Sequence, residues 1–332
     1  MIIFELVFIK YLYHNMKCRI CNNTENNKEY IVREMMFGTQ DEFKYFQCGE
    51  CGCLQILEFP KNIEKYYPKN YYSYRIHGQT NSIKRYLKNL RNRYAVTKKG
   101  IIGKILNKLA PNISLQLLRN IPIDKSTRIL DIGCGDGALL YDLCEIGYKN
   151  LLGIDPYIEN DIYYQNGLKI LKKSIFELDE KFDLIMFHHS FEHIREQFET
   201  LNKVRELLNP DGTVLICVPT VSSYAWEKYK EHWVQLDAPR HYFLHSINSM
   251  SILSENCGFH IKDKVFISDE FQFIGSEQYL RGIPLFSDNS YYKNKKDLIF
   301  EKNQISYYKK KAQELNYAKF GDTCAFFLKA IN

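Results

Sequence analysis

The stretch DIGCGDG, at residues 131–137, has the residue types and spacing of a loop that binds a nucleoside. Gly133, Gly135 and Ala138 fit the pattern G-x-G-x-x-G/A. Asp155 follows Gly133 by 22 residues, where a ribose-binding acid belongs. Glycines let a ligand approach the backbone at the start of a helix, and the acid can accept hydrogen bonds from both ribose hydroxyls. The spacing predicts a ligand with an adenosine ribose and leaves NAD as one candidate.

Four cysteines near the start of the chain form two C-x-x-C pairs with the spacing of a zinc site. They are Cys18, Cys21, Cys48 and Cys51, and 26 residues separate the two pairs. Two tight turns of this kind can present four thiolates to one ion in a tetrahedron. Metal binding would supply much of the folding free energy of so small a module, so we predict a structural Zn²⁺. The alternative is four buried cysteines without a ligand.

Two histidine-containing segments are candidates for binding a metal, accepting a proton or forming an acceptor pocket. The stretch HHSFEH places His189, Glu192 and His193 on one face if it is helical, where they could bind a divalent metal or orient a base. A pair of side chains satisfied at the start of a helix is the plainer alternative. Residues 220–246 hold both tryptophans and basic side chains, which suit an acceptor pocket past the end of a strand. We take His241 as the candidate base; the alternative is that the tryptophans are core packing for a lid.

The basic run from Lys84 to Lys108 contains no acidic residue. It could meet the diphosphate of a nucleotide sugar, an anionic membrane surface or RNA. The plainer alternative is a solvated helix face.

The elements that must position these residues alternate between strands and helices from residue 127 onward. The strand candidates are RILDIG, NLLGID, GLKILKKS, FDLIMFHH and TVLICVP, followed later by GFHIKDKVFIS and DTCAFFLKAI. This alternation predicts a doubly wound, Rossmann-like α/β fold with a mostly parallel sheet of seven strands and helices on both faces. A long helix should end at the turn formed by residues 209–212. Ligands of such sheets lie at the carboxyl ends of strands, where Asp131 and Asp155 fall.

Composition divides the chain into four parts. Residues 1–15 are a hydrophobic leader without a basic start or cleavage site, so we expect translation to begin at Met16; an N-terminal strand or helix is the alternative. The remaining parts are a zinc-ribbon-like module (16–60) with strands at 29–33 and 43–47, a Tyr/Lys/Arg-rich helical linker or lid (61–122) whose helical run spans 82–109, and the main domain (123–332) with substrate segment 220–246 and a helical insertion at 275–318.

Bulk properties exclude several classes of protein. The 332 residues are 45% hydrophobic, enough for a sizeable core and unlike a disordered or fibrous chain. The net charge of +6 is too mild to indicate a nucleic-acid binder. The ten cysteines do not form an even disulfide framework, which predicts a reducing, cytoplasmic location. The apolar start is too short to span a bilayer.

Four motifs, LDIGCGDG, GID, FDLIMFHHSFEH and LLNPDGTVLICVP, together resemble the class I S-adenosylmethionine-dependent methyltransferases. The resemblance covers roughly residues 125–268 and the last ten. It implies that the glycine loop holds the methionine portion with Asp131 near its ammonium, that Asp155 holds the ribose, and that His188 approaches the sulfonium. The cofactor residues that it implies are Asp131, Gly133, Cys134, Gly135, Gly137, Asp155, Pro156, Ser174, Ile175, Phe176 and His188, with residues 174–176 along the adenine. The alternatives are a capping role for Asp131 and a turn role for Asp155 before Pro156.

A further resemblance concerns the acceptor. The run W…LDAPRH is similar to that of methyltransferases from cell-surface glycan and secondary-metabolite biosynthesis, which implies a hydroxyl of a sugar or related small molecule as acceptor, with His241 and His193 as catalytic candidates. Some quinone O-methyltransferases resemble HHSFEH but carry an acid where this chain has His189, which weakens the metal interpretation. A nucleotide-linked or lipid-linked sugar would suit, with peripheral membrane contact, and nucleic acid is not expected.

Two other functions stay open. Some RNA base methyltransferases also begin with a zinc ribbon, although the fourth strand here ends in HHS and lacks the Asn/Asp-Pro-Pro-aromatic signature of enzymes that methylate exocyclic amines. The last alternative is a scaffold that binds S-adenosylmethionine without turnover.

Overall fold

The computed structural model describes residues 16–67, 81–293 and 299–331. The predicted leader at 1–15 lies outside these residues, as do parts of the linker and of the insertion. Among the described residues, no helix has both the length and the apolar character needed to cross a membrane.

The main sheet has eight strands, whose order is β11-β12-β9-β8-β4-β5-β7-β6. They are β4 (Ile129–Ile132), β5 (Leu151–Ile154), β6 (Ile162–Tyr163), β7 (Lys169–Leu171), β8 (Phe182–His188), β9 (Leu208–Pro219), β11 (Phe259–Phe266) and β12 (Thr323–Ala330). Strands β4, β5, β7, β8 and β9 pair in parallel, and β12 lies antiparallel to both neighbours. The doubly wound α/β fold is confirmed. The predicted count of seven strands was wrong by one, because the two-residue β6 adds an antiparallel edge.

The order of the strands reverses between β4 and β8. From β4 the chain moves outward through β5 to β7, and it then returns to the other side of β4 to form β8 and β9. Such a switch point leaves a crevice at the carboxyl ends of the strands, where open α/β sheets bind their ligands. The glycine loop follows β4 at this crevice, and the HHSFEH segment follows β8.

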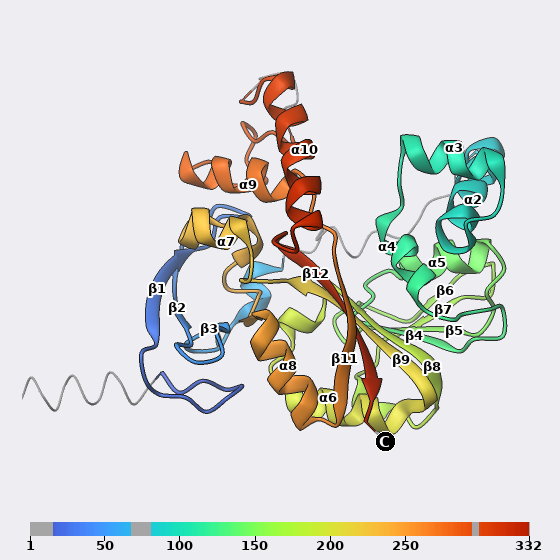
Figure 1. The fold of residues 1–332 in the computed structure, drawn as a ribbon, viewed down its shortest axis with the longest axis horizontal. Helices are drawn as coiled ribbons and strands as arrows, with labels where there is room; N and C mark the ends of the chain where they lie inside the picture. Colours follow the sequence, from blue (N-terminus) through green and yellow to red (C-terminus); the bar gives the residue numbers. More distant parts are fainter. Residues whose placement is uncertain (1–15, 68–80, 294–298, 332) are drawn as a thin grey trace, which may run out of the picture.

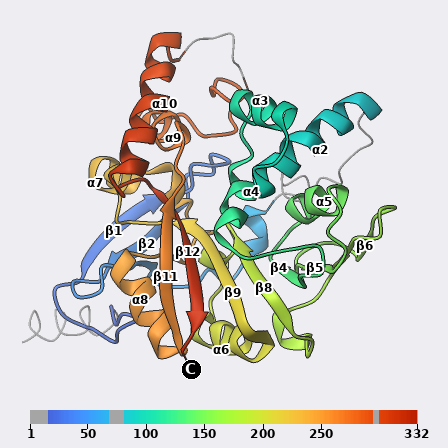
Figure 2. The ribbon, with the colours of Figure 1, turned by 45° about the vertical axis from the view of Figure 1, so that its right-hand side comes forward.

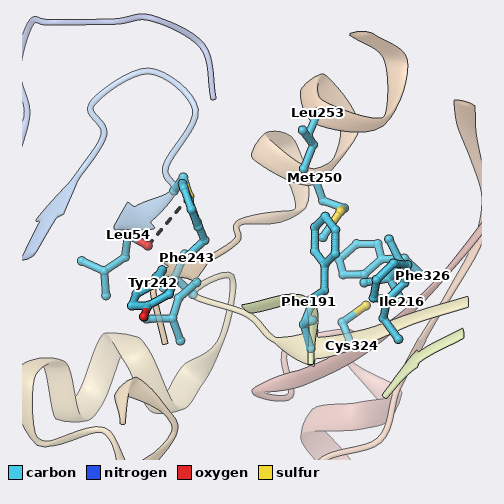
Figure 3. Packing of buried hydrophobic residues seen from close by; sticks show 14 of the residues in the cluster. Leu54, Phe191, Ile216, Tyr242, Phe243, Met250, Leu253, Cys324 and Phe326 are labelled. Carbon is cyan, nitrogen blue, oxygen red and sulfur yellow. Dashed lines mark hydrogen bonds between the residues drawn. The ribbon is translucent and has the colours of Figure 1, made fainter. Parts of the chain in front are cut away.

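Helices cover both faces of this sheet (Figure 1). One face packs against α2 (Ser82–Thr97), α4 (Ile113–Leu117) and α5 (Ala138–Glu145), and the other packs against α6 (Gln197–Leu207) and α8 (Ile247–Asn256). Each face of the sheet packs against its helices in a separate hydrophobic core. Side chains of β8 point alternately into the two cores, because successive residues of a strand point to opposite faces. Leu184 and Met186 belong to the first core, and Ile185 and Phe187 to the second. Figure 3 shows the second core, with Phe191 and Met250 packed near Phe326.

The N-terminal cysteines belong to a smaller antiparallel sheet. It contains β1 (Lys28–Arg33), β2 (Glu42–Gln47) and β3 (Leu54–Ile56), and its fourth strand is β10 (Phe243–Leu244) from the substrate segment. The two strands predicted at 29–33 and 43–47 are confirmed. Leu54 pairs with Leu244, and the hydroxyl of Tyr45 donates a hydrogen bond to the carbonyl of His241 at 2.9 Å. The module therefore packs directly on the segment that we expected to hold the acceptor.

The helical linker and the insertion differ in detail from the expected runs. Residues 82–109 form two helices, α2 and α3 (Ile101–Leu109), because Lys98 and Gly100 adopt φ of 58° and 100° between them. Helix α6 ends at Leu207 as expected, but residues 209–212 belong to strand β9. Further helices are α7 (Tyr224–Tyr229), α9 (Phe271–Leu280) and α10 (Lys302–Tyr317). Side chains of α9 and α10 pack in the same core as those of α6 and α8. In Figures 1 and 2 these two helices lie near the top of the molecule and to the left of α3.

Candidate cofactor and acceptor sites

Three glycines of the loop after β4 adopt a left-handed backbone. The φ angles of Gly133, Gly135 and Gly137 are 69°, 58° and 78°, a region that side chains disfavour. A Cβ atom on Gly133 would lie 2.5 Å from the Cβ of Ser190, and one on Gly137 would collide with the side chain of Ile170. The loop therefore needs glycine both for its turn and for its packing, in addition to the ligand access that the sequence indicated.

Asp155, which follows β5, ties the glycine loop to the next strand. Its Oδ2 accepts a hydrogen bond from the backbone N–H of Gly135 at 2.9 Å. Its Oδ1 accepts one from the N–H of Tyr157 at 2.8 Å, across Pro156, which is the turn role that the sequence had left as an alternative. Burial raises the pKa of Asp155, while these backbone hydrogen bonds oppose the shift. Each carboxylate oxygen can accept a further bond, so ribose hydroxyls could still be bound.

Asp131 lies in β4 directly before the loop and is 2% exposed. Its Oδ1 has no hydrogen-bond partner among the described residues. Burial, and then the nearby charge of Asp155, raise the pKa of Asp131 to about 8. A buried carboxylate oxygen without a partner is costly, and an ammonium group would satisfy it. The orphaned Asp131 and the side-chain-free loop thus fit the methionine portion of S-adenosylmethionine.

The other expected cofactor residues differ in their hydrogen bonding and in how exposed their side chains are. Ser174 caps the short turn Ile175–Glu177, because its Oγ accepts from Phe176 N–H while its own N–H donates to Glu177 at 2.7 Å. Ile175 is buried in the core, whereas the ring of Phe176 is half exposed and offers a flat apolar surface. The thiol of Cys134 lies 3.8 Å from the carbonyl of Gly135.

His188 ends β8, the strand next to β4. Its Nε2 is buried without a partner among the described residues. Burial, and then the neighbouring His189, lower the pKa of His188 to about 3, so its imidazole is neutral. A neutral ring beside the crevice adds no positive charge that would repel a sulfonium.

A cavity of about 360 Å³ is lined in part by the residues that follow β8. Its walls come from four parts of the chain: the N-terminal module, the HHSFEH segment, the substrate segment and the insertion. Its polar lining comprises His189, Glu192, His193, Gln235, Asp237 and His241. Its other lining residues are Met36, Val234, Phe271, Leu285, Phe286 and Tyr292. The two sequence-predicted catalytic histidines, His193 and His241, therefore line one cavity.

Hydrogen bonds fix how these two histidines present their rings. The Nδ1 of His241 lies 2.7 Å from the carbonyl of Gln235, and the Nδ1 of His193 lies 2.9 Å from the carbonyl of Arg240. Because a carbonyl only accepts, Nδ1 carries a proton in both rings, so the lone pair of a neutral ring lies on Nε2. Burial, followed by the nearby His193, lowers the pKa of His241 to about 4, so this ring is neutral at ordinary pH.

Glu192 is fully buried between the histidines, and neither of its carboxylate oxygens has a hydrogen-bond partner among the described residues. Its Oε1 lies 3.6 Å from Nδ1 of His189 and 3.9 Å from Nε2 of His241. Burial raises the pKa of Glu192, but the surrounding histidines, His189 foremost, outweigh burial and bring the pKa to about 2. The cavity thus contains a buried carboxylate that is ionised and faces imidazoles.

The grouping of these side chains differs from the one that sequence spacing suggested. Candidate metal-binding atoms of Glu192, His193 and His241 lie within 4.8 Å of one another, so this trio could hold a divalent ion. His189 instead groups with His188 and Cys217. The expected helical face does not form, because Phe191–His193 is a short 3-10 turn and His189 has a φ of 55°.

No local sequence pattern indicated the ion-pair network behind the cavity. Arg240 is fully buried, and its guanidinium bonds to Asp237, to Glu34 at 2.9 Å and to the carbonyl of Tyr66 at 3.0 Å. The pair Asp237–Arg240 is spaced i, i+3 and was visible in LDAPRH, but its partner in the N-terminal module was not. This network joins the small sheet to the cavity wall.

The tryptophans do not line the cavity, contrary to the expected aromatic pocket. Trp226 and Trp233 are 2% and 0% exposed and pack in the core, which was the alternative interpretation. Trp233 donates its indole N–H to Asp322 at 3.0 Å. His245 is likewise a satisfied core residue, bonded to Gln197 at 2.8 Å. The aromatic lining comes instead from Phe271, Phe286 and Tyr292.

The four cysteines of the N-terminal module converge as their spacing predicted. The sulfur atoms of Cys18, Cys21, Cys48 and Cys51 lie within 4.8 Å of one another, with Cys18–Cys51 and Cys21–Cys48 both at 3.5 Å. Four sulfurs at about 2.3 Å from a zinc ion would be about 3.8 Å apart in a tetrahedron. Gln55 donates a hydrogen bond to Cys18 Sγ at 3.0 Å, as expected beside a thiolate. The cluster is therefore compatible with Zn²⁺, and Cys53 lies outside it.

Comparison with known proteins gives a family match for the residues that form most of the main sheet. Residues 101–263 match the family model described as a methyltransferase domain. The chain is also similar to the ubiquinone biosynthesis O-methyltransferase of Azorhizobium caulinodans, with 29% identity over 113 residues. That match covers 30% of this chain and 44% of the relative, so it spans less than half of the relative's length.

Two solved structures are distant likenesses. A cyclopropane synthase from Mycobacterium tuberculosis has a TM-score of 0.44 and 16% identity, covering 67% of this chain and 84% of that one. An S-adenosylmethionine-dependent methyltransferase from Archaeoglobus fulgidus has a TM-score of 0.39 and 21% identity, covering 65% of this chain and 92% of that one. The fold assignment rests on the strand order of this chain and not on these likenesses.

Residues 101–263 are therefore a methyltransferase domain. This match, together with a doubly wound sheet in which β12 is antiparallel, supports a methyltransferase of class I, the class that uses S-adenosylmethionine. Between the two ligands that the glycine spacing left open, the family match favours S-adenosylmethionine over NAD.

Proposed function

We propose that this chain transfers a methyl group from S-adenosylmethionine to a hydroxyl of a small-molecule acceptor, such as a sugar or a secondary-metabolite precursor. One observation carries the proposal: the glycine loop and the histidine cavity are joined through Ser190. Its Oγ donates a hydrogen bond to the carbonyl of Ile132 at 2.6 Å, and its Cβ packs against Gly133. His189 and Glu192, on either side of Ser190, line the cavity. A ligand in the loop and an acceptor in the cavity would thus be neighbours.

The cofactor would be held at the carboxyl ends of β4 and β5. Bound S-adenosylmethionine supplies a methyl group on a positively charged sulfur. The loop glycines leave its backbone open to close approach, Asp131 offers an unpaired carboxylate oxygen, and Asp155 offers further acceptor capacity for ribose hydroxyls. Phe176 adds an exposed ring that can lie along the adenine.

The acceptor hydroxyl must lose a proton as the new bond forms, and the cavity holds a base for it. The neutral ring of His241 keeps its lone pair on Nε2, and Gln235 holds the ring by its Nδ1–H. When Nε2 takes the proton, the carboxylate of Glu192 at 3.9 Å stabilises the imidazolium. His193, whose ring lies 4.7 Å from that of His241, is the second candidate for this role. Methyl transfer is an in-line displacement, so the remaining contribution is positioning.

The shape of the cavity limits the acceptor to a small molecule or to the end of a larger one. A volume of about 360 Å³ lies at the small end of ligand pockets, which usually span about 300–1,000 Å³. The apolar wall of Leu285 and Phe286 and the polar wall of histidines and acids suit a molecule with one apolar and one hydroxylated face. A nucleotide-linked or lipid-linked sugar is the acceptor class that we propose.

In this proposal the cysteine cluster holds a structural Zn²⁺ and its module forms one wall of the acceptor site. Met36 lines the cavity, and Glu34 pairs with the buried Arg240 behind it. The metal would fold the module, and the module would hold the wall.

The experiment is to incubate the full chain with S-adenosylmethionine carrying a labelled methyl group and a panel of nucleotide sugars, with bulk RNA as a separate sample. We expect acceptor-dependent formation of S-adenosylhomocysteine and label in a sugar, both reduced in His241→Ala and unchanged in the matched exposed variant His260→Ala. Label in RNA would support the RNA alternative. Tight cofactor binding without S-adenosylhomocysteine from any sample would support a scaffold.

A further inference from the structure

Helix α3 turns its apolar side chains toward solvent. Ile101, Ile102, Ile105 and Leu109 are 80%, 57%, 57% and 78% exposed. Ile101, Ile105 and Leu109 are spaced four residues apart and Ile102 lies three residues before Ile105, so all four adjoin on one side of the helix. We call these four residues the α3 apolar face. Exposed patches of this kind in otherwise soluble domains mark interaction sites.

The packing of α3 on α2 fixes this orientation. Gly103 is the buried residue of α3, and a Cβ atom there would lie 2.8 Å from the Cβ of Tyr94 and overlap the carbonyl oxygen of Leu90. Only a glycine allows this close approach of the two helices. The side of α3 that carries Gly103 thus packs on α2, and the α3 apolar face must point away from α2. Figure 1 shows α3 at the upper right edge of the molecule.

The segment that carries this face contains four lysines and no acidic residue. Lys98, Lys99, Lys104 and Lys108 are exposed and form no ion pair within the described part of the chain. Two basic residues of α2 are instead paired with acids of α5: Arg85 pairs with Glu145, and Lys88 pairs with Asp142 at 2.6 Å. The basic run therefore has two parts. The first part pairs with acids of α5 and holds α2 on that helix. The second part carries unpaired positive charge near the aliphatic side chains of α3.

We propose that the α3 apolar face and its four lysines dock on an anionic membrane surface. An amphipathic helix binds there by placing aliphatic side chains at the level of the acyl chains and cations among the acidic head groups. RNA would engage the lysines but would leave four aliphatic side chains in water, because nucleic-acid surfaces use cations and stacking rings. The combination of aliphatic and cationic groups on one short helix thus favours a bilayer. This surface is separate from the cofactor and acceptor sites, so the inference does not depend on the proposed function.

The test is sedimentation of the full chain with vesicles of phosphatidylcholine alone and of phosphatidylcholine mixed with phosphatidylglycerol. We expect binding to the mixed vesicles only. Two variants separate the contributions: a triple variant with Ile101→Ser, Ile105→Ser and Leu109→Ser, and one with the four lysines changed to Gln. Each should weaken binding by about tenfold or more, since both terms contribute. Ile31→Ser is the matched control, because Ile31 is 55% exposed on β1.

Four results would overturn the proposal. The first is no binding of the unaltered chain to the mixed vesicles, and the second is equal binding by the triple variant. The third is a dimer that the triple variant disrupts while vesicle binding stays the same, which would mean that a second copy covers the face. The fourth is RNA binding that the four-lysine variant loses and the triple variant keeps, which would mean that the lysines bind nucleic acid instead. Unchanged S-adenosylhomocysteine binding by every variant shows that the fold is intact.

Discussion

The Nε2 of His241 lies 3.9 Å from the carboxylate of Glu192, although the two residues come from different segments of the chain. The carboxylate is fully buried and has no hydrogen-bond partner among the described residues. An ionised acid in such a place is stabilised by imidazoles that can become charged. The pair therefore has the arrangement of a base and the group that stabilises its protonated form.

The first prediction concerns this base. His241→Ala should lower kcat by about 100-fold or more and leave the Kd for S-adenosylhomocysteine unchanged. Glu192→Gln should also lower kcat, because the imidazolium loses its counter-charge. Because burial lowers the pKa of His241 to about 4, its lone pair is present well below neutrality. At saturating cofactor, kcat should stay level between about pH 6 and 8. A kcat unchanged in His241→Ala would refute the assignment.

The second prediction concerns the glycine loop. Gly133→Ala should abolish cofactor binding, because the new Cβ would lie 2.5 Å from that of Ser190 and distort the loop. Gly167→Ala is the matched control: its φ of 91° is also left-handed, but nothing lies within 4 Å of a Cβ there. Both variants bear a similar backbone penalty of about 1 kcal/mol. Titration calorimetry should show lost binding in the first and retained binding in the second. Equal binding by both would show that the loop does not form the site.

The third prediction follows from the raised pKa of Asp131, about 8 in the ligand-free chain. Below that pH the carboxyl group is mostly protonated, and a nearby ammonium would favour its ionised form. Binding of S-adenosylhomocysteine should therefore release a proton near neutral pH, and affinity should rise as pH increases toward 8. Calorimetry in two buffers of different ionisation enthalpy measures this release. Asp131→Asn should bind more weakly without the release; the same release in that variant would contradict the assignment.

The fourth prediction concerns zinc. The purified chain should contain one zinc ion, which Cys51→Ser should lose and Cys53→Ala should keep, because Cys53 is buried outside the cluster. Loss of zinc should lower the free energy of unfolding and expose the wall that Met36 contributes. Elemental analysis gives the stoichiometry. A chain that contains no metal would end the zinc claim, and a second ion that disappears in His241→Ala would show that Glu192, His193 and His241 hold a metal.

The fifth prediction concerns the buried ion-pair network. Arg240→Met would leave Glu34 and Asp237 buried without a counter-charge, which should cost about 3–5 kcal/mol of unfolding free energy. Arg33→Met removes an exposed partner of Glu42 and should cost less than about 1 kcal/mol. Denaturant unfolding measures both. Equal losses would show that the buried network does not hold the module on the cavity wall.

Local patterns predicted most of the fold. The alternation of apolar runs and helical segments located every long strand of the main sheet, because buried parallel strands require continuous apolar stretches. The edge strand β6 could not be predicted, since two residues carry no periodicity. The helical run of 82–109 was wrong at Lys98–Gly100, where a left-handed residue and a glycine separate α2 from α3.

The site was predictable where its residues are close in sequence. The glycine loop with Asp155 and the four cysteines follow fixed spacings, and the structure brings each set together as those spacings predicted. The trio of Glu192, His193 and His241 joins two distant segments, and spacing could not show that His241 would replace His189 in it. The partnership of Glu34 with Arg240 and the pairing of β3 with β10 depend on how the module docks, which no local pattern encodes.

The most direct test of the central claim is calorimetric titration of the full chain with S-adenosylhomocysteine and, separately, with NAD, for the unaltered protein and for Asp155→Ala. We predict tight binding of S-adenosylhomocysteine, its loss in the variant, and no binding of NAD. Binding of NAD without S-adenosylhomocysteine would contradict the account and would identify the glycine loop as a dinucleotide site.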